Sequence, residues 1–427
     1  MKVLYIGDNR NRGNFGCRGT STALSMLIRK NHEITGVITG KYTDQRNGYL
    51  FYYSFLPSWA YVFFGKHKTL RLVFENIVQR FGGRKTDFAS LDLKKSIKNL
   101  KKCIPSNPML EELNLENYVF DAIVVNGEGS FIFKTPTWRE PLVLTILIYW
   151  AKLLGKKVFF MNAMFSDSPA SPQNIEFLHI VDKLLASCDR VVLREKESYE
   201  YAKKYLPHIK PQIVPDALFS WFPYINDDYI INNYRYCIAH SAENDNYYDS
   251  IDFSKPYILI AASSSGIGCV PEAIPAYVFL AKQTEKELGR KVFLIQTCDG
   301  DSFLNEVSKA SNIPIIPMET PLLTVAKILS KADCFISGRY HPAVMASQGG
   351  TPCVFMKSNS HKTKSIQELL NYDYIKEFND LPDIEEVKGI INLAKSYIEQ
   401  GVILRNKIRS RAKELYELSL NISNLIY

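Results

Sequence analysis

Residues 122–161 read AIVVNGEGSFIFKTPTWREPLVLTILIYWAKLLGKKVFFM. The apolar run at 122–125 has the length of a buried strand, and a second run follows at 157–161. Between them, 142–154 has the length and apolar character of a buried helix, and Gly155 is a typical residue at a helix C-terminus. The order of strand, helix and strand predicts parallel pairing in a sheet that is covered on both faces.

The same alternation continues on both sides of this unit. Residues 3–6 are predicted to form the first strand and 21–30 its helix, and 191–193 forms a later strand. A second series of apolar runs begins after the polar stretch 225–254. Its predicted strands are 257–260, 292–295, 315–316, 334–336 and 352–355.

These runs predict an α/β fold with two doubly wound, Rossmann-like domains that face a cleft. We place the N-terminal domain at 1–224, a linker and surface loop at 225–254, and the C-terminal domain at 255–427. The last helical stretch, 383–418, is expected either to stay with the C-terminal domain or to pack back on the N-terminal one.

The composition is that of an ordinary globular protein. The chain has 427 residues, of which 46% are hydrophobic and 22% charged. Its eight cysteines form no C-x-x-C pair, which favours reduced thiols over a disulfide framework or a metal site. No stretch has the composition of a signal peptide or a spanning helix, so we expect a cytoplasmic protein.

The positive charge is concentrated in one segment. The whole chain carries +8, and residues 66–102 contain 11 basic and 3 acidic side chains, so the rest is balanced. This concentration disfavours a general nucleic-acid-binding protein. The uncharged run 49–64 precedes it and contains nine aromatic residues. For the segment 49–102 we favour aromatics packed inside the domain with the lysines facing water. The alternatives are contact with an anionic membrane and an acidic glycan as the partner.

Ligands of open parallel sheets bind beyond the carboxyl ends of the strands. The most informative such loop contains Arg339 and His341, after the predicted strand 334–336 and before a helix that has Pro342 in its first turn. Backbone N–H groups at a helix N-terminus favour an anion, Arg donates a fork of hydrogen bonds and His titrates near neutral pH. The alternative is a surface Arg beside a His that caps the helix.

Three further loops carry polar groups after strands: 11–20, 126–130 and 262–268. Their glycines permit close approach of a ligand to the backbone, although each also fits an ordinary turn. None is a G-x-G-x-x-G or Walker A motif. The candidate residues in these loops are Asn14, Arg18, Asn126, Glu128, Ser263, Ser264 and Gly266.

The stretch 332–352 contains an acidic residue, a short strand, S-x-R-x-H, a helix of small residues and G-x-P. This combination resembles the C-terminal signature of the polysaccharide pyruvyl transferase family. Other pieces follow the order found in that family: D-x-x-x-x-x-G-x-G-S at 121–130, V-L-R-E-x-x-S at 192–198 and V-P-D at 214–216.

The resemblance implies a GT-B-like fold and transfer of the pyruvyl group of phosphoenolpyruvate to a sugar, as a ketal and with release of phosphate. The sugar would belong to a surface polysaccharide or its lipid-linked precursor, and no cofactor or metal is implied. Arg339 would bind an anionic group of the donor and His341 would act as general acid and base. The residues implied near the donor are Arg339, Tyr340, Arg194, Ser263, Ser264 and Gly266; those near the acceptor are Asn14, Arg18, Asn126 and Glu128.

Two other functions stay open. A GT-B glycosyltransferase that uses a nucleotide sugar would share the fold. A non-catalytic assembly protein of a glycan-synthesis complex is the other alternative, although it would not need Arg339 and His341. A lipid-linked acceptor would bring the protein to the inner face of the membrane as a peripheral protein.

Overall fold

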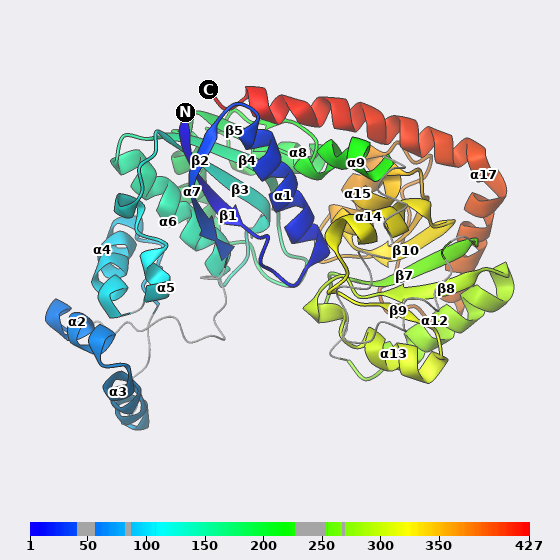
Figure 1. Ribbon diagram of the computed structural model, residues 1–427, viewed down its shortest axis with the longest axis horizontal. Helices are drawn as coiled ribbons and strands as arrows, with labels where there is room; N and C mark the ends of the chain where they lie inside the picture. Colours follow the sequence, from blue (N-terminus) through cyan, green and yellow to red (C-terminus); the bar gives the residue numbers. More distant parts are fainter. Residues whose placement is uncertain (41–55, 82–86, 107, 227–252, 254, 267–269) are drawn as a thin grey trace. The chain divides into compact units, whose positions relative to one another are not determined.

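The computed structural model describes residues 1–40, 56–81, 87–106, 108–226, 253, 255–266 and 270–427 (Figure 1). These residues form two compact units. Unit 1 comprises Met1–Arg12, Ser25–Ile213 and Ile422–Tyr427, and unit 2 comprises Gly13–Leu24 and Val214–Asn421. Most of the linker predicted at 225–254, and residues 49–55 and 82–86 of the aromatic and basic segment, lie outside the described residues.

Unit 1 contains a six-stranded sheet in which every pairing is parallel. The strand order is β2-β1-β3-β4-β5-β6. The strands are β1 (Lys2–Asp8), β2 (Glu33–Thr39), β3 (Ala122–Ile132), β4 (Lys157–Ser166), β5 (Arg190–Leu193) and β6 (Gln212–Ile213). The order reverses between β1 and β3, so the sheet is doubly wound.

The helices that lie wholly or partly in unit 1 have, on average, more residues than strands β5 and β6. They are α1 (Phe15–Arg29), α2 (Ser58–Lys66), α3 (Lys68–Arg80), α4 (Leu93–Cys103), α5 (Pro108–Glu111), α6 (Arg139–Leu153), α7 (Ile175–Leu185) and α8 (Lys196–Tyr205). The N-terminal part of α1 is grouped with unit 2.

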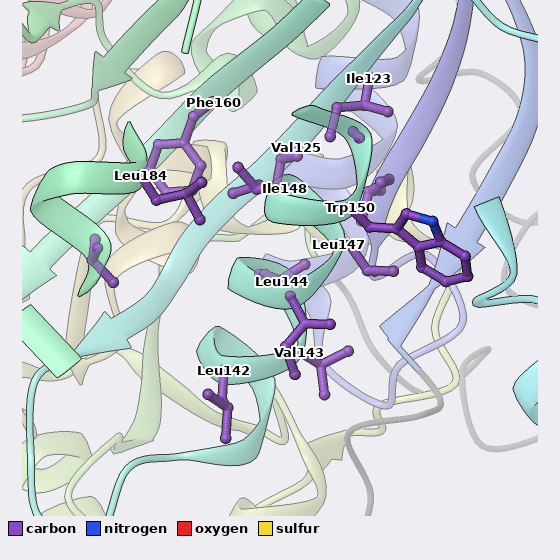
Figure 2. Packing of buried hydrophobic residues seen from close by; sticks show 14 of the residues in the cluster. Ile123, Val125, Leu142, Val143, Leu144, Leu147, Ile148, Trp150, Phe160 and Leu184 are labelled. Carbon is purple, nitrogen blue, oxygen red and sulfur yellow. The ribbon is translucent and has the colours of Figure 1, made fainter. Parts of the chain in front are cut away.

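The core of unit 1 is built around α6, which is apolar on all sides and therefore buried. Figure 2 shows Leu144, Leu147 and Ile148 of this helix among side chains of the sheet, such as Val125 and Phe160. All five of these side chains are fully buried. This packing agrees with the helix predicted at 142–154.

Strands β3 and β4 are longer than the sequence predicts. Residues 126–130 were predicted to be a loop, but β3 continues to Ile132 and pairs with β4 beyond Glu128. The prediction of a loop was wrong because the residues after the glycines are apolar. Phe131 and Phe165 are fully buried and their ring centroids lie 5.9 Å apart, so burial extends the pairing.

Unit 2 contains a second parallel sheet of six strands in the order β12-β11-β10-β7-β8-β9. This is the strand order of Rossmann dinucleotide-binding domains. The strands are β7 (Tyr257–Ser263), β8 (Lys291–Ile295), β9 (Ile315–Ile316), β10 (Cys334–Gly338), β11 (Cys353–Met356) and β12 (Glu377–Phe378). The prediction of two doubly wound α/β domains is confirmed.

The helices of unit 2 connect these strands, and α17 follows them. They are α9 (Phe222–Asn226), α12 (Ala273–Leu288), α13 (Leu304–Ser311), α14 (Leu322–Lys331), α15 (Tyr340–Gln348), α16 (Lys362–Leu369) and α17 (Ile384–Ser419). Helix α17 breaks at Gly401, where φ is +54°. It is grouped with unit 2, whereas the terminal residues Ile422–Tyr427 belong to unit 1. In the described part of the chain, no helix combines the length and apolar composition needed to cross a bilayer.

Candidate active site

In unit 2 the strand order reverses between β7 and β10, and the carboxyl ends of these two strands lie side by side. Gly338 of β10 is the register partner of Ser263 of β7, and Ser337 Oγ donates a hydrogen bond to the carbonyl of Ala262 at 3.1 Å. A Cβ at Gly338 would collide with the Ser263 side chain, so glycine is required for this approach. The loop that leads to Arg339 and the loop after Ser263 therefore meet at the switch point.

His341 is the second residue of α15 and is only 8% exposed. Its Nε2 lies 3.3 Å from Oδ2 of Asp216, a carboxylate that is completely buried. The other oxygen of Asp216 accepts hydrogen bonds from Thr20 Oγ1 at 2.8 Å and from the backbone N–H of Leu218 at 2.9 Å. This arrangement fixes the orientation of the imidazole.

The N-terminus of α1 packs against the same imidazole. A Cβ at Gly16 would stand 2.5 Å from His341 Nδ1, so only glycine fits there. The start of α1 is held by a hydrogen bond from the backbone N–H of Phe15 to the carbonyl of Thr297 at 2.9 Å. On another side, the buried ring of Tyr340 meets the His341 ring edge to face, with centroids 5.2 Å apart.

Arg339 immediately precedes α15, and its guanidinium is largely buried. Nη2 forms an ion pair with Asp301, which is fully buried. The Asp301 carboxylate also accepts hydrogen bonds from Thr297, at 3.0 Å from its backbone N–H and at 2.6 Å from its hydroxyl. Arg339 Nε is buried and has no hydrogen-bond partner among the described residues.

The electrostatic environment keeps Arg339 charged. Burial lowers the pKa of Arg339, but the Asp301 carboxylate outweighs that effect, so the pKa of Arg339 lies above its ordinary value. A buried donor without a partner costs about 1–3 kcal/mol. An anion bound at Nε would remove this cost, which makes Arg339 the best candidate for anion binding in unit 2.

Asn14 and Arg18 lie in unit 2, although we predicted them for the N-terminal domain. Asn14 Oδ1 accepts a hydrogen bond from the backbone N–H of Cys17 at 3.1 Å and so caps α1. Arg18 Nη1 donates to the carbonyl of Met318 at 3.4 Å. Burial lowers the pKa of Arg18, while Glu319 opposes this shift. Local contacts with the loops after β8 and β9 thus group these residues with Arg339 and His341.

The hydroxyl groups after β7 already have partners. Ser263 Oγ donates to the carbonyl of Lys357, and Ser264 Oγ donates to Asn359 Oδ1 at 3.2 Å. Gly266 has a φ of +86° and open space around the position of a Cβ. Because both hydroxyls already donate within the protein, an anion bound at this loop would depend on backbone N–H groups.

Asn126 and Glu128 lie in unit 1, on β3, close to the point where its sheet reverses its order. Glu128 Oε2 accepts a hydrogen bond from Asn9 Nδ2 at 2.5 Å. Asn126 accepts one from Asn162 Nδ2 at 3.2 Å and donates to the carbonyl of Gly7 at 3.3 Å. Glu128 and Asn162 have φ values of +40° and +57°, a backbone conformation that residues other than glycine rarely adopt. This polar cluster is the part of unit 1 that best fits recognition of hydroxyl groups.

Arg194 also lies in unit 1, but it is only 1% exposed. Its Nε donates to Glu195 Oε2 at 3.3 Å, and its Nη2 lies 3.9 Å from Met164 Sδ. A role of Arg194 as a clamp on the donor stays a prediction.

The family profile of polysaccharide pyruvyl transferases matches residues 28–361. The chain belongs to this family. It is therefore a transferase of polysaccharide metabolism, as its C-terminal signature predicts. A search of curated protein sequences gives no significant match.

The solved structures that share the fold of this pyruvyl transferase have low sequence identity to it. Neisseria meningitidis UDP-GlcNAc 2-epimerase, bound to UDP-GlcNAc, has a TM-score of 0.53 at 13% identity over 100% of this chain and 98% of that chain. For Staphylococcus aureus MnaA with UDP the values are 0.54 and 12%, over 99% and 94%. The Rickettsia bellii UDP-N-acetylglucosamine 2-epimerase gives 0.52 and 14%, over 100% and 98%. These likenesses confirm the two-domain Rossmann-like fold predicted for the pyruvyl transferase.

Two carboxylates of the pyruvyl transferase site were not among the predicted site residues. Asp216 belongs to a V-P-D motif whose role no local pattern reveals, and Asp301 is part of no motif at all. Both act through side chains that are distant in sequence, which is why they were missed. Among the described residues, no group of three or more His, Cys, Asp or Glu side chains is arranged to hold a metal ion.

Proposed function

We propose that this enzyme transfers the pyruvyl group of phosphoenolpyruvate to a sugar and forms a pyruvate ketal with release of phosphate. The observation that carries the proposal is the buried Nε of Arg339, directly before the N-terminus of α15, a charged donor for which the described part of the chain offers no hydrogen-bond partner. Phosphoenolpyruvate carries a carboxylate and a phosphate. Arg339 would bind one of these groups, and the backbone N–H groups at the start of α15 would favour the other.

His341 is proposed as the general acid and base. Its Nε2 lies beside the Asp216 carboxylate, and the Gly16 backbone lies against the Nδ1 side of the ring. General acid and base help is typically worth about 10²–10⁴-fold in rate.

The proposed reaction has three steps. Protonation of the methylene carbon C3 of phosphoenolpyruvate creates an oxocarbenium-like centre at C2. A sugar hydroxyl then attacks C2, and its proton passes to the base. A second hydroxyl of the same sugar forms the other C–O bond as the C2–O bond to phosphate breaks, and its proton leaves with the phosphate.

The acceptor is proposed to be a sugar of a surface polysaccharide or of its lipid-linked precursor. Asn126 and Glu128 offer an amide and a carboxylate for sugar hydroxyls, and they lie within β3 of unit 1. Asn14 and Arg18 are grouped with unit 2, so we no longer favour them for the acceptor over the donor. Tyr340, Arg194, Ser263, Ser264 and Gly266 stay predictions for the donor.

Thermal unfolding with different ligands tests the donor. A ligand that binds only the folded state raises the unfolding temperature. We expect phosphoenolpyruvate to raise it more than inorganic phosphate does at equal concentration, and UDP-GlcNAc to leave it unchanged. A rise with UDP-GlcNAc and none with phosphoenolpyruvate would instead identify a glycosyltransferase that uses a nucleotide sugar.

A further inference from the structure

Helices α2 and α3 expose an unusual number of large apolar side chains. Trp59 is 71% exposed and Phe81, just after α3, is 86% exposed. Exposed apolar side chains that stand singly need no explanation, but a contiguous group marks an interaction surface. The exposed group comprises Trp59, Val62, Phe63, Leu70, Leu72, Val73, Ile77 and Phe81; we call it the α2–α3 face.

The spacing places most of these residues on one side of each helix, although Leu72, two positions after Leu70, lies off the α3 stripe. On α2, Trp59 is followed by exposed residues at i+3 and i+4. On α3, Leu70, Val73 and Ile77 follow the i, i+3, i+7 pattern of a single helical face. Each helix therefore presents an ordered apolar stripe.

The opposite sides of the two helices already pack within unit 1. Phe64 of α2 and Phe74 of α3 lie with ring centroids 4.9 Å apart. Tyr61 is fully buried, and Lys102 Nζ of α4 lies 5.3 Å from the centre of its ring. Helices α2, α3 and α4 are drawn in blue to cyan in Figure 1. Because the inner sides of the helices already have partners, the α2–α3 face is left for another surface.

Exposed basic residues stand at the ends of α2 and α3 and on α4, which contacts α2. Lys66 ends α2 and Arg80 ends α3, and both are exposed, as are Lys94, Lys95 and Lys98 of α4. The acidic residues nearby are engaged within the protein.

Each of these carboxylates has a partner. Glu75 is buried and pairs with Arg71 at 3.5 Å, and Asp87 pairs with Arg139 at 2.6 Å. Asp92 caps α4 by accepting from the backbone N–H of Lys95. The exposed charge around the α2–α3 face is thus basic, and it complements an anionic surface.

We propose that the α2–α3 face docks the protein on an anionic bilayer. The apolar stripes would enter the interface between headgroups and acyl chains, while Lys and Arg contact the anionic headgroups. A second copy of the chain is a poorer occupant, because a two-fold contact would bring the same positive charges together. The proposal concerns this surface alone and holds whichever donor the enzyme uses.

Vesicle flotation of the full chain tests the proposal. We expect binding to vesicles of phosphatidylcholine with phosphatidylglycerol, and much weaker binding to phosphatidylcholine alone. Trp59→Ala with Phe63→Ala should weaken binding by about tenfold or more, since each would bury a large apolar side chain. Lys66→Ala with Arg80→Ala should weaken it by about fivefold per side chain and reduce its dependence on salt.

Matched controls distinguish binding through the α2–α3 face from non-specific binding to vesicles. Val402 and Ile403 of α17 are also exposed, so Val402→Ala with Ile403→Ala removes comparable apolar area elsewhere. Lys286→Ala with Lys309→Ala removes two exposed lysines from α12 and α13. Both controls should bind vesicles like the unchanged protein, and circular dichroism checks that all variants are folded.

Two results would overturn the proposal. One is the absence of binding to anionic vesicles, or binding that the α2 substitutions do not weaken. The other is a dimer in sedimentation equilibrium that Trp59→Ala with Phe63→Ala converts to a monomer, without any vesicle binding. That second result would identify the α2–α3 face as an interface between copies.

Discussion

Oδ2 of Asp216 lies 3.3 Å from Nε2 of His341, although the two residues are 125 positions apart in the sequence. Asp216 follows β6, and His341 is in the first turn of α15. The carboxylate is fully buried and its second oxygen is held by Thr20 and by a backbone N–H, so it has a single orientation. The contact with Asp216 therefore fixes the orientation of the His341 imidazole. The first two predictions depend on this contact.

Asp216→Asn should reduce turnover much more than donor binding. The amide keeps the size of the side chain but replaces the carboxylate oxygen beside His341 Nε2 and removes its negative charge. We expect kcat to fall about 10²-fold or more, within the range of general acid and base catalysis, with the affinity for phosphoenolpyruvate changed less than about threefold. Phosphate release measures kcat, and Asp333→Asn, at the ion pair with Arg290, is the matched control. Equal losses in both variants would mean that Asp216 has only a structural role.

Gly16→Ala should displace the His341 ring, because the new Cβ would lie 2.5 Å from Nδ1. Overpacking of this kind costs about 1–3 kcal/mol of stability, and the displaced ring should lower kcat. Gly300→Ala is the control, since its Cβ would make only ordinary contacts at 3.5 Å or more. Urea unfolding and phosphate release check both effects; full activity of Gly16→Ala would show that the ring position is unimportant.

Three thiols should react with alkylating agents much faster after unfolding than in the folded protein. Burial raises the pKa of Cys103, Cys188 and Cys334 to about 12, and it raises the pKa of Cys298 despite the opposing charge of Arg339. At pH 8 a thiol with a pKa near 12 is about 10⁻⁴ thiolate, a fraction that rises tenfold with each pH unit. Peptide mapping after iodoacetamide treatment at pH 8 should therefore find Cys103, Cys188 and Cys334 unmodified. Rapid native modification of these three would contradict the described burial.

Leu147→Ala should destabilise unit 1. Leu147 is fully buried in α6 and lies in the cluster seen in Figure 2. Removing a buried leucine side chain typically costs about 2–5 kcal/mol. Urea unfolding followed by circular dichroism measures the change, and Leu153→Ala, at an exposed position of the same helix, should change stability much less. A similar effect of both substitutions would mean that α6 is not packed as described.

The alternation of strands and helices was predictable because each element carries its own local signal. Apolar runs such as those of β4 and β7 mark buried strands, and Gly155 marks the end of α6. The short strands β6 and β12, with two residues each, have no such signal. The continuation of β3 past Glu128 was missed because glycines suggested a turn, while burial of the following phenylalanines decided the structure.

Only the part of the site that lies within one short motif was predictable from the sequence. Arg339 and His341 stand in one short stretch after β10, so their place at a helix N-terminus follows from sequence. Asp301 lies 38 positions before Arg339, and only the folded sheet brings the pair together. The same is true of Asp216, whose partner is selected by the tertiary structure rather than by spacing.

Arg339 is proposed to bind an anionic group of phosphoenolpyruvate. Calorimetric titration of phosphoenolpyruvate into the unchanged protein, Arg339→Ala and Arg290→Ala tests this role. We predict one binding event in the unchanged protein and in Arg290→Ala, and an affinity at least about tenfold weaker in Arg339→Ala, as expected for a lost charged hydrogen bond. Equal affinity in Arg339→Ala, or binding of UDP-GlcNAc in place of phosphoenolpyruvate, would contradict the proposed role of Arg339 in binding phosphoenolpyruvate.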